Sequence, residues 1–173
     1  LFLHTAGSVS IDVFQGMALH YGVFYPMQTF SRQKRVSFEE IPCFIEGSGE
    51  EETAAIEALA SQLSHRVYRL SSEARKYLHL SAVFACNFVN HCYAISAELL
   101  EKHGIPFDVM LPLIDETAAK VHQMSPKDAQ TGPAVRYDEN VIRAQSQLLK
   151  NNPLVKDIYD RMSMNIHRLS EEV

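Results

Sequence analysis

The spacing of apolar and polar residues changes along the chain and predicts two parts of different structure. In the first 70 residues, short apolar runs over residues 1–4, 21–25, 43–46 and 66–70 end at turn-forming residues and predict strands. Apolar residues recur at helical spacing over residues 51–63, which predicts an amphipathic helix. Strands that alternate with helices favour a partly parallel α/β sheet.

From residue 71 onward the pattern is helical. Ser72 is a favourable N-cap, and neither Pro nor Gly follows until Gly104, so one helix is predicted over residues 73–103. Three more helices are predicted over residues 107–122, 139–149 and 154–169. We therefore expect an α/β part over residues 1–71 and an all-α part over residues 72–173.

Composition excludes several classes of protein. The 173 residues carry a formal charge of −5. Proteins that bind nucleic acid usually carry an excess of basic residues, so this class is not expected. No apolar run approaches the roughly 18 residues that a membrane helix needs. The three cysteines form no C-x-x-C pair, and the eight histidines show no metal-binding spacing, so neither a disulfide scaffold nor a metal site is expected. A reducing cytoplasm is the expected location.

The predicted long helix carries polar groups in its apolar middle. At about 100° per residue in an α-helix, His79, Asn87 and Asn90 share one side, with Cys86 between them. Such groups need partners when they are buried. Three alternatives stay open: a polar network with neighbouring helices, an interface with another chain, or a site that binds a ligand.

Two loops are further candidates. In one, Gly132 follows Thr131 and lets the backbone approach a ligand, and Arg136 offers paired donors to a carboxylate or phosphate. The alternative is local, with Asp138 capping the next helix and Arg136 paired with a nearby acid.

The other loop, residues 4–8, follows the first predicted strand, and ligands of open α/β sheets gather at the carboxyl ends of strands. Gly7 gives backbone access there, and Thr5 or Ser8 supplies a hydroxyl. The alternative for this loop is an ordinary turn.

Four segments in order carry a resemblance to a known family: HTAGS at residues 4–8, YPMQTF at 25–30, HLSAVFACNF at 79–88 and TGPAVRYD at 131–138. Together they resemble NADP oxidoreductases in which a Rossmann-like domain precedes a C-terminal helical domain, relatives of pyrroline-5-carboxylate reductase and the β-hydroxyacid dehydrogenases. Two residues depart from the family pattern: Tyr25 replaces the usual His, and Tyr137 replaces the usual Gly.

The resemblance implies a fold and an activity. Residues 1–71 would be the remainder of the nucleotide-binding domain, and residues 72–173 the helical substrate and dimerisation domain. The implied reaction transfers hydride between NADP (or NAD) and a small carbonyl or imine compound. The alternative is a non-catalytic dimeric protein that senses a nucleotide or acts as a scaffold and keeps the fold.

The resemblance also assigns site residues. His79 would donate or accept the proton, as suits a side chain with a pKa near neutral, and Asn87 would position the substrate. From the helix spacing and the two loops described above, we further expect substrate binding by Asn90, Thr131, Gly132 and Arg136, and cofactor binding by His4, Thr5, Gly7 and Ser8.

The chain opens with Leu1 inside a predicted strand, so we expect a fragment of a longer protein. It contains no G-x-G-x-x-G turn, the motif that binds the pyrophosphate of a dinucleotide. The cofactor would therefore be held mainly by residues that precede Leu1.

The length of the predicted helix suggests a partner. A helix of about 30 residues spans about 45 Å, and the roughly 100 residues of the helical part are too few to wrap it. We expect its apolar faces to meet a second copy in a homodimer.

Overall fold

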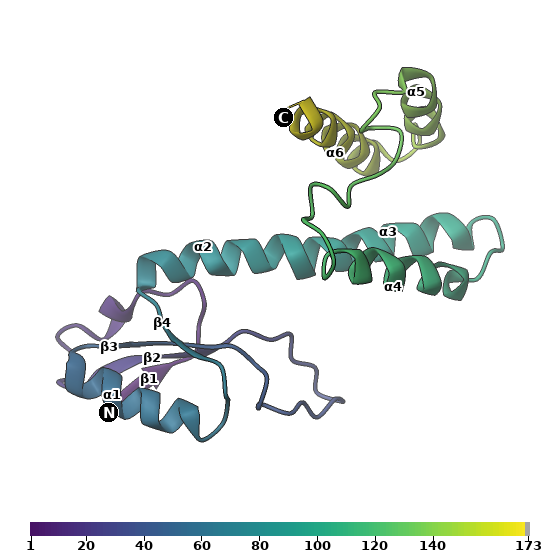
Figure 1. The fold of residues 1–173 in the computed structure, drawn as a ribbon. Coiled ribbons are helices and arrows are strands. Elements are labelled where there is room, and N and C mark those ends of the chain that lie inside the picture. Colours follow the sequence, from purple (N-terminus) through teal and green to yellow (C-terminus); the bar gives the residue numbers. More distant parts are fainter. Residues whose placement is uncertain (172–173) are drawn as a thin grey trace. The chain divides into compact units, whose positions relative to one another are not determined.

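The structure is a computed structural model that describes residues 1–171. The chain divides into two compact units, Leu1–Cys92 and Tyr93–Val173. The first unit contains the sheet and the second is helical (Figure 1). This architecture confirms the predicted fold class, an α/β part that resembles half of a Rossmann-like domain followed by a helical part.

A four-stranded sheet forms the centre of the first unit. Its strands are β1 (Phe2–His4), β2 (Tyr21–Pro26), β3 (Cys43–Gly47) and β4 (Val67–Arg69), in the order β1-β2-β3-β4. β1 pairs with β2 in parallel, β2 with β3 antiparallel, and β3 with β4 in parallel. The sheet is therefore partly parallel, as the alternation of strands and helices predicted.

Helix α1 (Glu50–Ser61) covers one face of this sheet. Ile45 of β3 packs there against Ile56 and Ala60 of α1, and all three are fully buried. Within the predicted helix over residues 51–63, Leu59 stays exposed, and Leu63, also exposed, lies beyond the end of α1, so the buried stripe is narrower than the periodicity suggests. The partly buried residues around this core are Leu3, Phe24 and Val67.

The opposite face of the sheet carries polar side chains. Successive residues of a strand point to opposite faces, so Tyr25 and Glu46 point away from the face on which Phe24 and Ile45 meet α1. Helix α2 (Ser72–Ala82) lies over this second face, on the other side of the sheet from α1 (Figure 1). The alternation of the strands thus directs Tyr25 and Glu46 toward α2.

The predicted long helix is interrupted by a wider turn. α2 continues into a π-helical segment, η2 (Val83–Phe88), and then into α3 (Val89–Glu101). Gly104 follows with φ of +68°, the left-handed terminator that the sequence predicts. A π segment adds a residue to the turn. The angle of 100° per residue, from which the shared side of His79, Asn87 and Asn90 was predicted, therefore does not apply beyond Val83.

The N-cap of α2 differs from the prediction. Ser71, not Ser72, caps the helix by accepting a hydrogen bond from the Ala74 amide. Ser72 instead uses its hydroxyl for tertiary contacts, since it accepts from the Ile11 amide and donates to Glu46.

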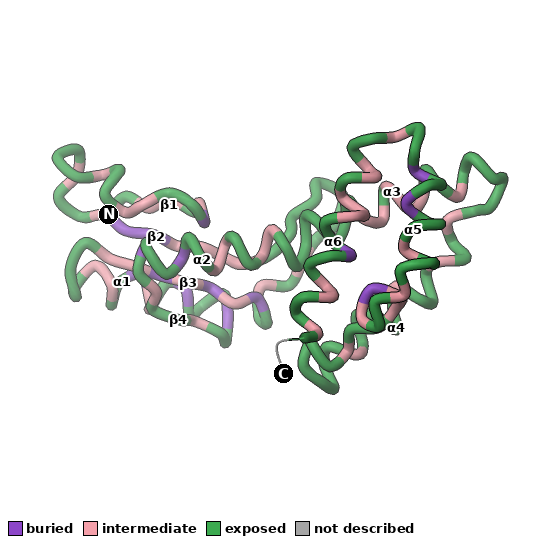
Figure 2. The backbone as a smooth tube through the Cα atoms, turned by 90° about the horizontal axis from the view of Figure 1, so that it is seen from above, coloured by how far each residue is buried: buried purple, intermediate pink, exposed green. Residues whose placement is uncertain are grey.

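The second unit consists of helices with little buried surface. After η3 (Phe107–Met110) and α4 (Leu111–Lys120), Asp138 caps α5 (Glu139–Leu148) as predicted, and α6 is Pro153–Glu171. α3, η3 and α4 contain no buried residue, and most of their length is exposed in Figure 2. Among the described residues of this unit, the buried ones are Ala134, Ser146, Leu149 and Ser163.

The compact units do not divide where the strands end. The predicted boundary at residue 71 marks the end of the last strand, whereas the units divide between Cys92 and Tyr93, inside α3. The functional assignment of residues 1–71 and 72–173 stays a prediction, and residues 172–173 of the second domain lie outside the described part of the chain.

Candidate functional site

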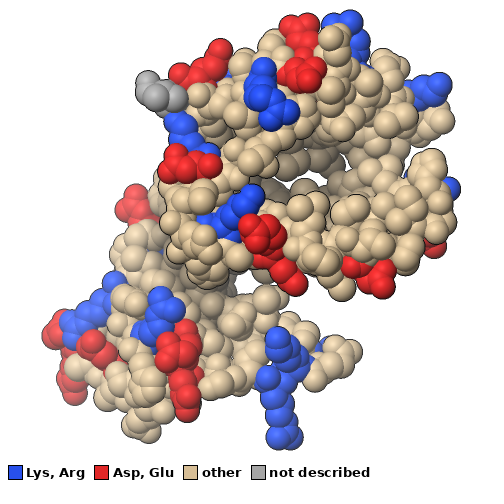
Figure 3. Space-filling view, turned by 45° about the vertical axis from the view of Figure 1, so that its right-hand side comes forward, with Lys and Arg blue, Asp and Glu red and all other residues tan. Residues whose placement is uncertain are grey.

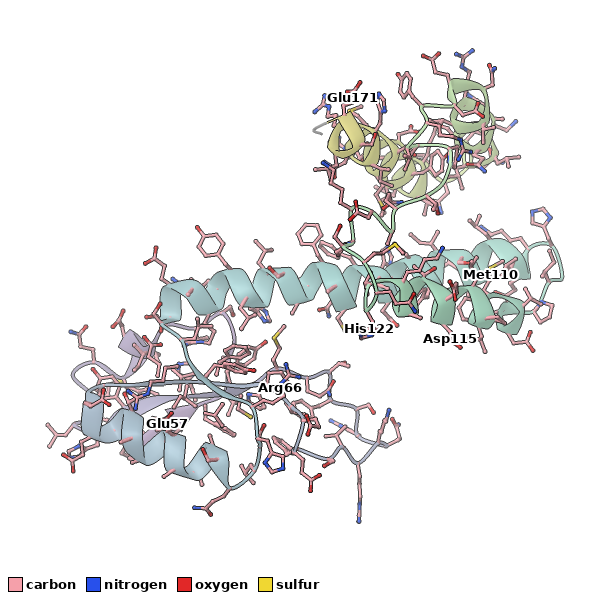
Figure 4. All side chains as sticks on the ribbon, viewed as in Figure 1. Glu57, Arg66, Met110, Asp115, His122 and Glu171 are labelled. Atoms are coloured by element: carbon pink, nitrogen blue, oxygen red, sulfur yellow. The ribbon has the colours of Figure 1, made fainter. Side chains whose placement is uncertain are left out.

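A pocket of about 400 Å³ lies in the first unit, where the end of β2 and the loop after it meet α2 and η2. Side chains from the sheet and from α2 meet between these elements (Figure 4). None of the lining residues is an acid, a lysine or an arginine. The pocket is lined by Tyr25, Met27, Gln28, Thr29, His79, Ala82, Ala85, Cys86 and Asn87.

Tyr25 and His79 form the polar centre of this pocket. The Tyr25 hydroxyl lies 3.2 Å from Nδ1 of His79, and the two rings meet edge to face with centroids 6.2 Å apart. Burial raises the pKa of Tyr25, and the nearby charge of Arg75 opposes this only in part. The phenol therefore keeps its proton at neutral pH.

Gly7 brings the predicted loop after β1 against this pair. A Cβ on Gly7 would lie 2.6 Å from Nδ1 of His79 and 2.9 Å from Cζ of Tyr25. Any larger residue would displace one of the two rings. Three of the segments that carry the family resemblance, at residues 4–8, 25–30 and 79–88, thus converge on one site.

The rest of that loop is held beside the site but makes few bonds of its own. His4, at the end of β1, accepts a hydrogen bond on Nδ1 from the Ala6 amide, and its Nε2 is buried without a partner among the described residues. Burial lowers the pKa of His4, Arg75 lowers it further, and the Ser10 backbone and Glu46 oppose them. Thr5 and Ser8 are exposed, and no described residue bonds to their hydroxyls.

Arg75 anchors the loop to the helix, and the sequence analysis missed it. Its side chain is fully buried and forms an ion pair of 2.8 Å with Glu46 at the end of β3. It also donates to the Val9 carbonyl at 2.6 Å and to the Ser72 hydroxyl at 3.0 Å. Arg75 precedes His79 by one helical turn, so its bonds fix the part of α2 that presents the imidazole.

The two asparagines predicted on the same side as His79 are separated by the structure. Asn87 lines the pocket and Asn90 does not. The cause is the π segment, which changes the register of the helix between His79 and Asn90. Both asparagines are exposed without a described partner, so the structure does not place them in a sealed polar network. Their roles in substrate binding stay predictions.

The remaining predicted substrate-binding residues belong to the second unit. Gly132 has φ of +103°, and a Cβ there would meet nothing within 4 Å, so backbone conformation rather than crowding requires glycine. Thr131 and Arg136 are exposed, and no described residue bonds to the Arg136 guanidinium. The predicted pairing of Arg136 with a nearby acid is therefore absent from the described residues.

Tyr137, the second departure from the family pattern, occupies a position that suits glycine. Its φ of +50° lies in the left-handed region. Its ring stacks on His167 of α6, with centroids 4.2 Å apart, and Ser170 of α6 donates to the Val135 carbonyl. These contacts hold the loop of residues 131–138 against α6 in spite of the backbone strain.

The described residues, 1–171, offer neither a metal site nor a membrane span. No group of three His, Cys, Asp or Glu side chains there is placed to hold a metal ion. No helix in this range is long and apolar enough to cross a membrane. On the face that Figure 3 shows, basic side chains are scattered among acidic ones and do not form a continuous basic field.

The site can be compared with known proteins. The chain is similar to the crystal structure of "putative NADP oxidoreductase" from Bacteroides fragilis, with 59% identity over 96% of this chain and a TM-score of 0.92. It spans 64% of the length of that relative. A structure from Thermotoga maritima matches with 22% identity over 98% of this chain and 68% of its own, and a TM-score of 0.78, which shows the fold alone.

No curated protein matches the chain. A family model described as "Domain of unknown function (DUF2520)" matches residues 41–166, which include the whole helical side of the pocket and the loop of Thr131, Gly132 and Arg136. The match covers well over half of the chain. The chain therefore belongs to the DUF2520 family.

Proposed function

We propose that this chain supplies the substrate-binding and proton-transferring part of an oxidoreductase that uses NADP or NAD and acts on a small carbonyl or imine compound. The observation that carries the proposal is the convergence of Gly7, Tyr25 and His79 at a pocket that Asn87 also lines. The name of the Bacteroides fragilis relative, which is 59% identical, supports the same class of activity.

The residues of this chain fit one end of a dinucleotide better than the other. The loop after β1, whose Gly7 lies against His79, offers the unbonded hydroxyls of Thr5 and Ser8 at the carboxyl end of a parallel strand. This suits the nicotinamide end. The chain has no G-x-G-x-x-G turn for the pyrophosphate, so the phosphates would be held elsewhere in the intact protein.

The bound nicotinamide would supply hydride, and the chain would manage the proton. Hydride addition to a carbonyl carbon leaves negative charge on the oxygen, which must be met by a proton. His79 is the titratable side chain of the pocket that suits this near neutral pH. Asn87 would hold the substrate through its amide, which no described residue occupies.

The lining of the pocket restricts the substrate. With no Lys or Arg on its wall, this part of the site has no partner for a carboxylate. A charged substituent would need a cation that does not line this pocket.

We also propose a homodimer formed through the helical part. The second unit buries few apolar side chains, and α4 exposes Leu111 and Leu113. A unit of about 80 residues needs a sizeable apolar core to be stable alone. Light scattering at micromolar concentration would test this: a dimer mass is expected, and a monomer mass would contradict it.

Turnover tests the proposed activity. In the intact protein, NADPH oxidation would be followed with a panel of small aldehydes, ketones and imines, for the natural sequence and for His79→Gln. Loss of the acid–base group should lower kcat/KM by about 10²–10⁴-fold. His91→Gln is the matched control, because His91 is exposed on the same long helix and does not line the pocket.

Two outcomes would remove the proposal: no binding of NADPH at millimolar concentration, or turnover unchanged in His79→Gln. The alternative is a non-catalytic nucleotide sensor or scaffold, and Tyr25 in place of the family's usual His would fit it if the site thereby lost a polar group. Tyr25 still supplies a polar group to the site, since it bonds to His79, so this departure no longer favours the alternative.

A further inference from the structure

The two nitrogens of His79 have different surroundings. Nδ1 meets the Tyr25 hydroxyl, which has no other partner among the described residues. Nε2 has no described partner, and it is not one of the buried atoms that lack one. One side of the ring is thus used by the fold, and the other is open to a ligand or solvent.

The two neutral tautomers of the His79 ring, with the proton on Nδ1 or on Nε2, differ in the hydrogen bonds that they allow with Tyr25. If Nδ1 carried the proton, it would donate to the phenol oxygen, and the phenol's own proton would have no acceptor among the described residues. If Nε2 carries the proton, the phenol donates to the bare Nδ1, and the Nε2 proton lies on the side of the ring that is open to a ligand or solvent. The second arrangement thus leaves no proton without an acceptor at the contact between the two side chains.

We infer that Tyr25 is a positioning residue, which holds the neutral His79 ring with its proton on Nε2 and thereby presents a hydrogen-bond donor to the pocket. The donor that results recognises an acceptor atom of the ligand: a carbonyl oxygen or an imine nitrogen.

Tyr25 itself does not deliver the proton. A relay from the phenol through His79 would leave a phenolate in the site. Burial raises the pKa of Tyr25, which makes that charge unfavourable. The geometry and the desolvation of the hydroxyl therefore agree on an orienting role.

The catalytic consequence rests on the proposed function. In the direction of reduction, the protonated ring gives its Nε2 proton to the substrate oxygen: an O–H bond forms as the N–H bond breaks. The Nδ1 proton then points to the Tyr25 oxygen, which accepts it, because a hydroxyl both donates and accepts. In the resting site, the neutral ring donates its Nε2–H to the acceptor atom of the oxidised substrate, and it must take up a second proton before it can give one.

Nitrogen NMR tests the inference without turnover. The chain would be labelled with ¹⁵N-histidine, and the His79 signals would be assigned by their loss in His79→Gln. At a pH where the ring is neutral, the natural sequence should show a single form with the proton on Nε2. Tyr25→Phe should lose this single form and show both tautomers, as free imidazole does.

Tyr68→Phe is the matched control. Tyr68 lies on β4, stacks on Phe44 and has no described partner for its hydroxyl, so its removal should leave the His79 signals unchanged. Three results would overturn the inference: a proton on Nδ1 in the natural sequence, a mixture of tautomers there, or unchanged His79 signals in Tyr25→Phe. The first two do not depend on whether a variant folds.

The outcomes separate this inference from the proposed function. The tautomer is measured on the protein alone, whereas the proposed function is tested by NADPH turnover in His79→Gln. A single Nε2–H tautomer together with no turnover would leave Tyr25 as the orienting residue of a binding site and remove the oxidoreductase. Turnover with a mixture of tautomers would support the oxidoreductase and remove the orienting role of Tyr25.

Discussion

Arg75 and His79 lie one turn apart on α2, and both face the sheet, but they use their polar atoms differently. Arg75 is fully buried, and its guanidinium bonds to Glu46, Val9 and Ser72. His79 is half-buried and makes one described bond, to Tyr25, with Nε2 left over. A place on the side of a helix that faces the sheet therefore does not by itself distinguish a structural role from a functional one.

What distinguishes the two residues is which atoms stay unused. The bonds of Arg75 join three segments that are distant in sequence: the loop of Val9, the end of β3 and the start of α2. They contribute to folding. The remaining nitrogen of His79 contributes nothing to the fold that the structure shows, so we expect its loss to affect binding and turnover more than stability.

The largest effect on stability is expected for Arg75→Ala. Removing one member of a buried ion pair leaves the other charge without its partner, which typically costs about 3–5 kcal/mol in the free energy of unfolding. Urea unfolding followed by circular dichroism would measure it. Lys76→Ala is the control, because Lys76 is the exposed neighbour with no described partner. Equal midpoints for the two variants would show that the buried network does not stabilise the unit.

Gly7→Ala should lower the free energy of unfolding by less than Arg75→Ala does, and it should also disturb the His79 site. The added Cβ would overlap the His79 and Tyr25 rings, and overpacking of this kind costs about 1–3 kcal/mol. It should also shift the NMR signals of both rings. Ser8→Ala, an exposed neighbour, should change neither. A stable Gly7→Ala variant with unshifted His79 signals would mean that the loop does not lie against the site.

His79→Gln should be milder still in the free energy of unfolding. It removes one hydrogen bond to a half-buried ring, worth about 0.5–1.5 kcal/mol, while it lowers turnover by orders of magnitude. Urea unfolding of the variant used for turnover would measure this directly. A loss as large as that of Arg75→Ala would place His79 among the structural residues and would break the contrast between them.

Local patterns predicted most of the fold. The apolar runs gave β2 and β3 to within a residue or two. Gly104 and Asp138 ended and began helices as expected, because caps depend on neighbouring backbone groups. The choice between Ser71 and Ser72 as the cap could not be predicted, because it depends on the Ile11 amide, which lies 61 residues away and engages Ser72. The π segment carries no Gly or Pro that would have marked it.

The candidate site was predicted only in part, because some of its contacts join residues that are distant in sequence. His79, Asn87 and Gly7 follow from the family resemblance and lie together, but Tyr25 counted only as a departure from the pattern. Its role depends on its contact with His79, which lies 54 residues away along the chain. Arg75 was missed because its partner Glu46 lies 29 residues away. In a strand-rich unit such long-range pairings decide which polar residues meet, and spacing along the chain does not report them.

The smallest expected effect is a pH dependence of stability that His4 contributes to the Arg75 region. In the folded protein, burial lowers the pKa of His4 below its ordinary value of 6.5, and the charge of Arg75 lowers it further. Above pH 6.5 the ring is neutral in both states. As the pH falls below 6.5, the unfolded chain binds a proton that the folded chain resists, so stability is lost.

Unfolding midpoints at pH 7.5 and 5.5 should therefore differ less in His4→Gln than in the natural sequence. His65→Gln, which removes an exposed histidine, should keep the full difference. If His4→Gln kept it too, another group would have to provide the pH dependence, and His4 would not be held neutral by its burial beside Arg75.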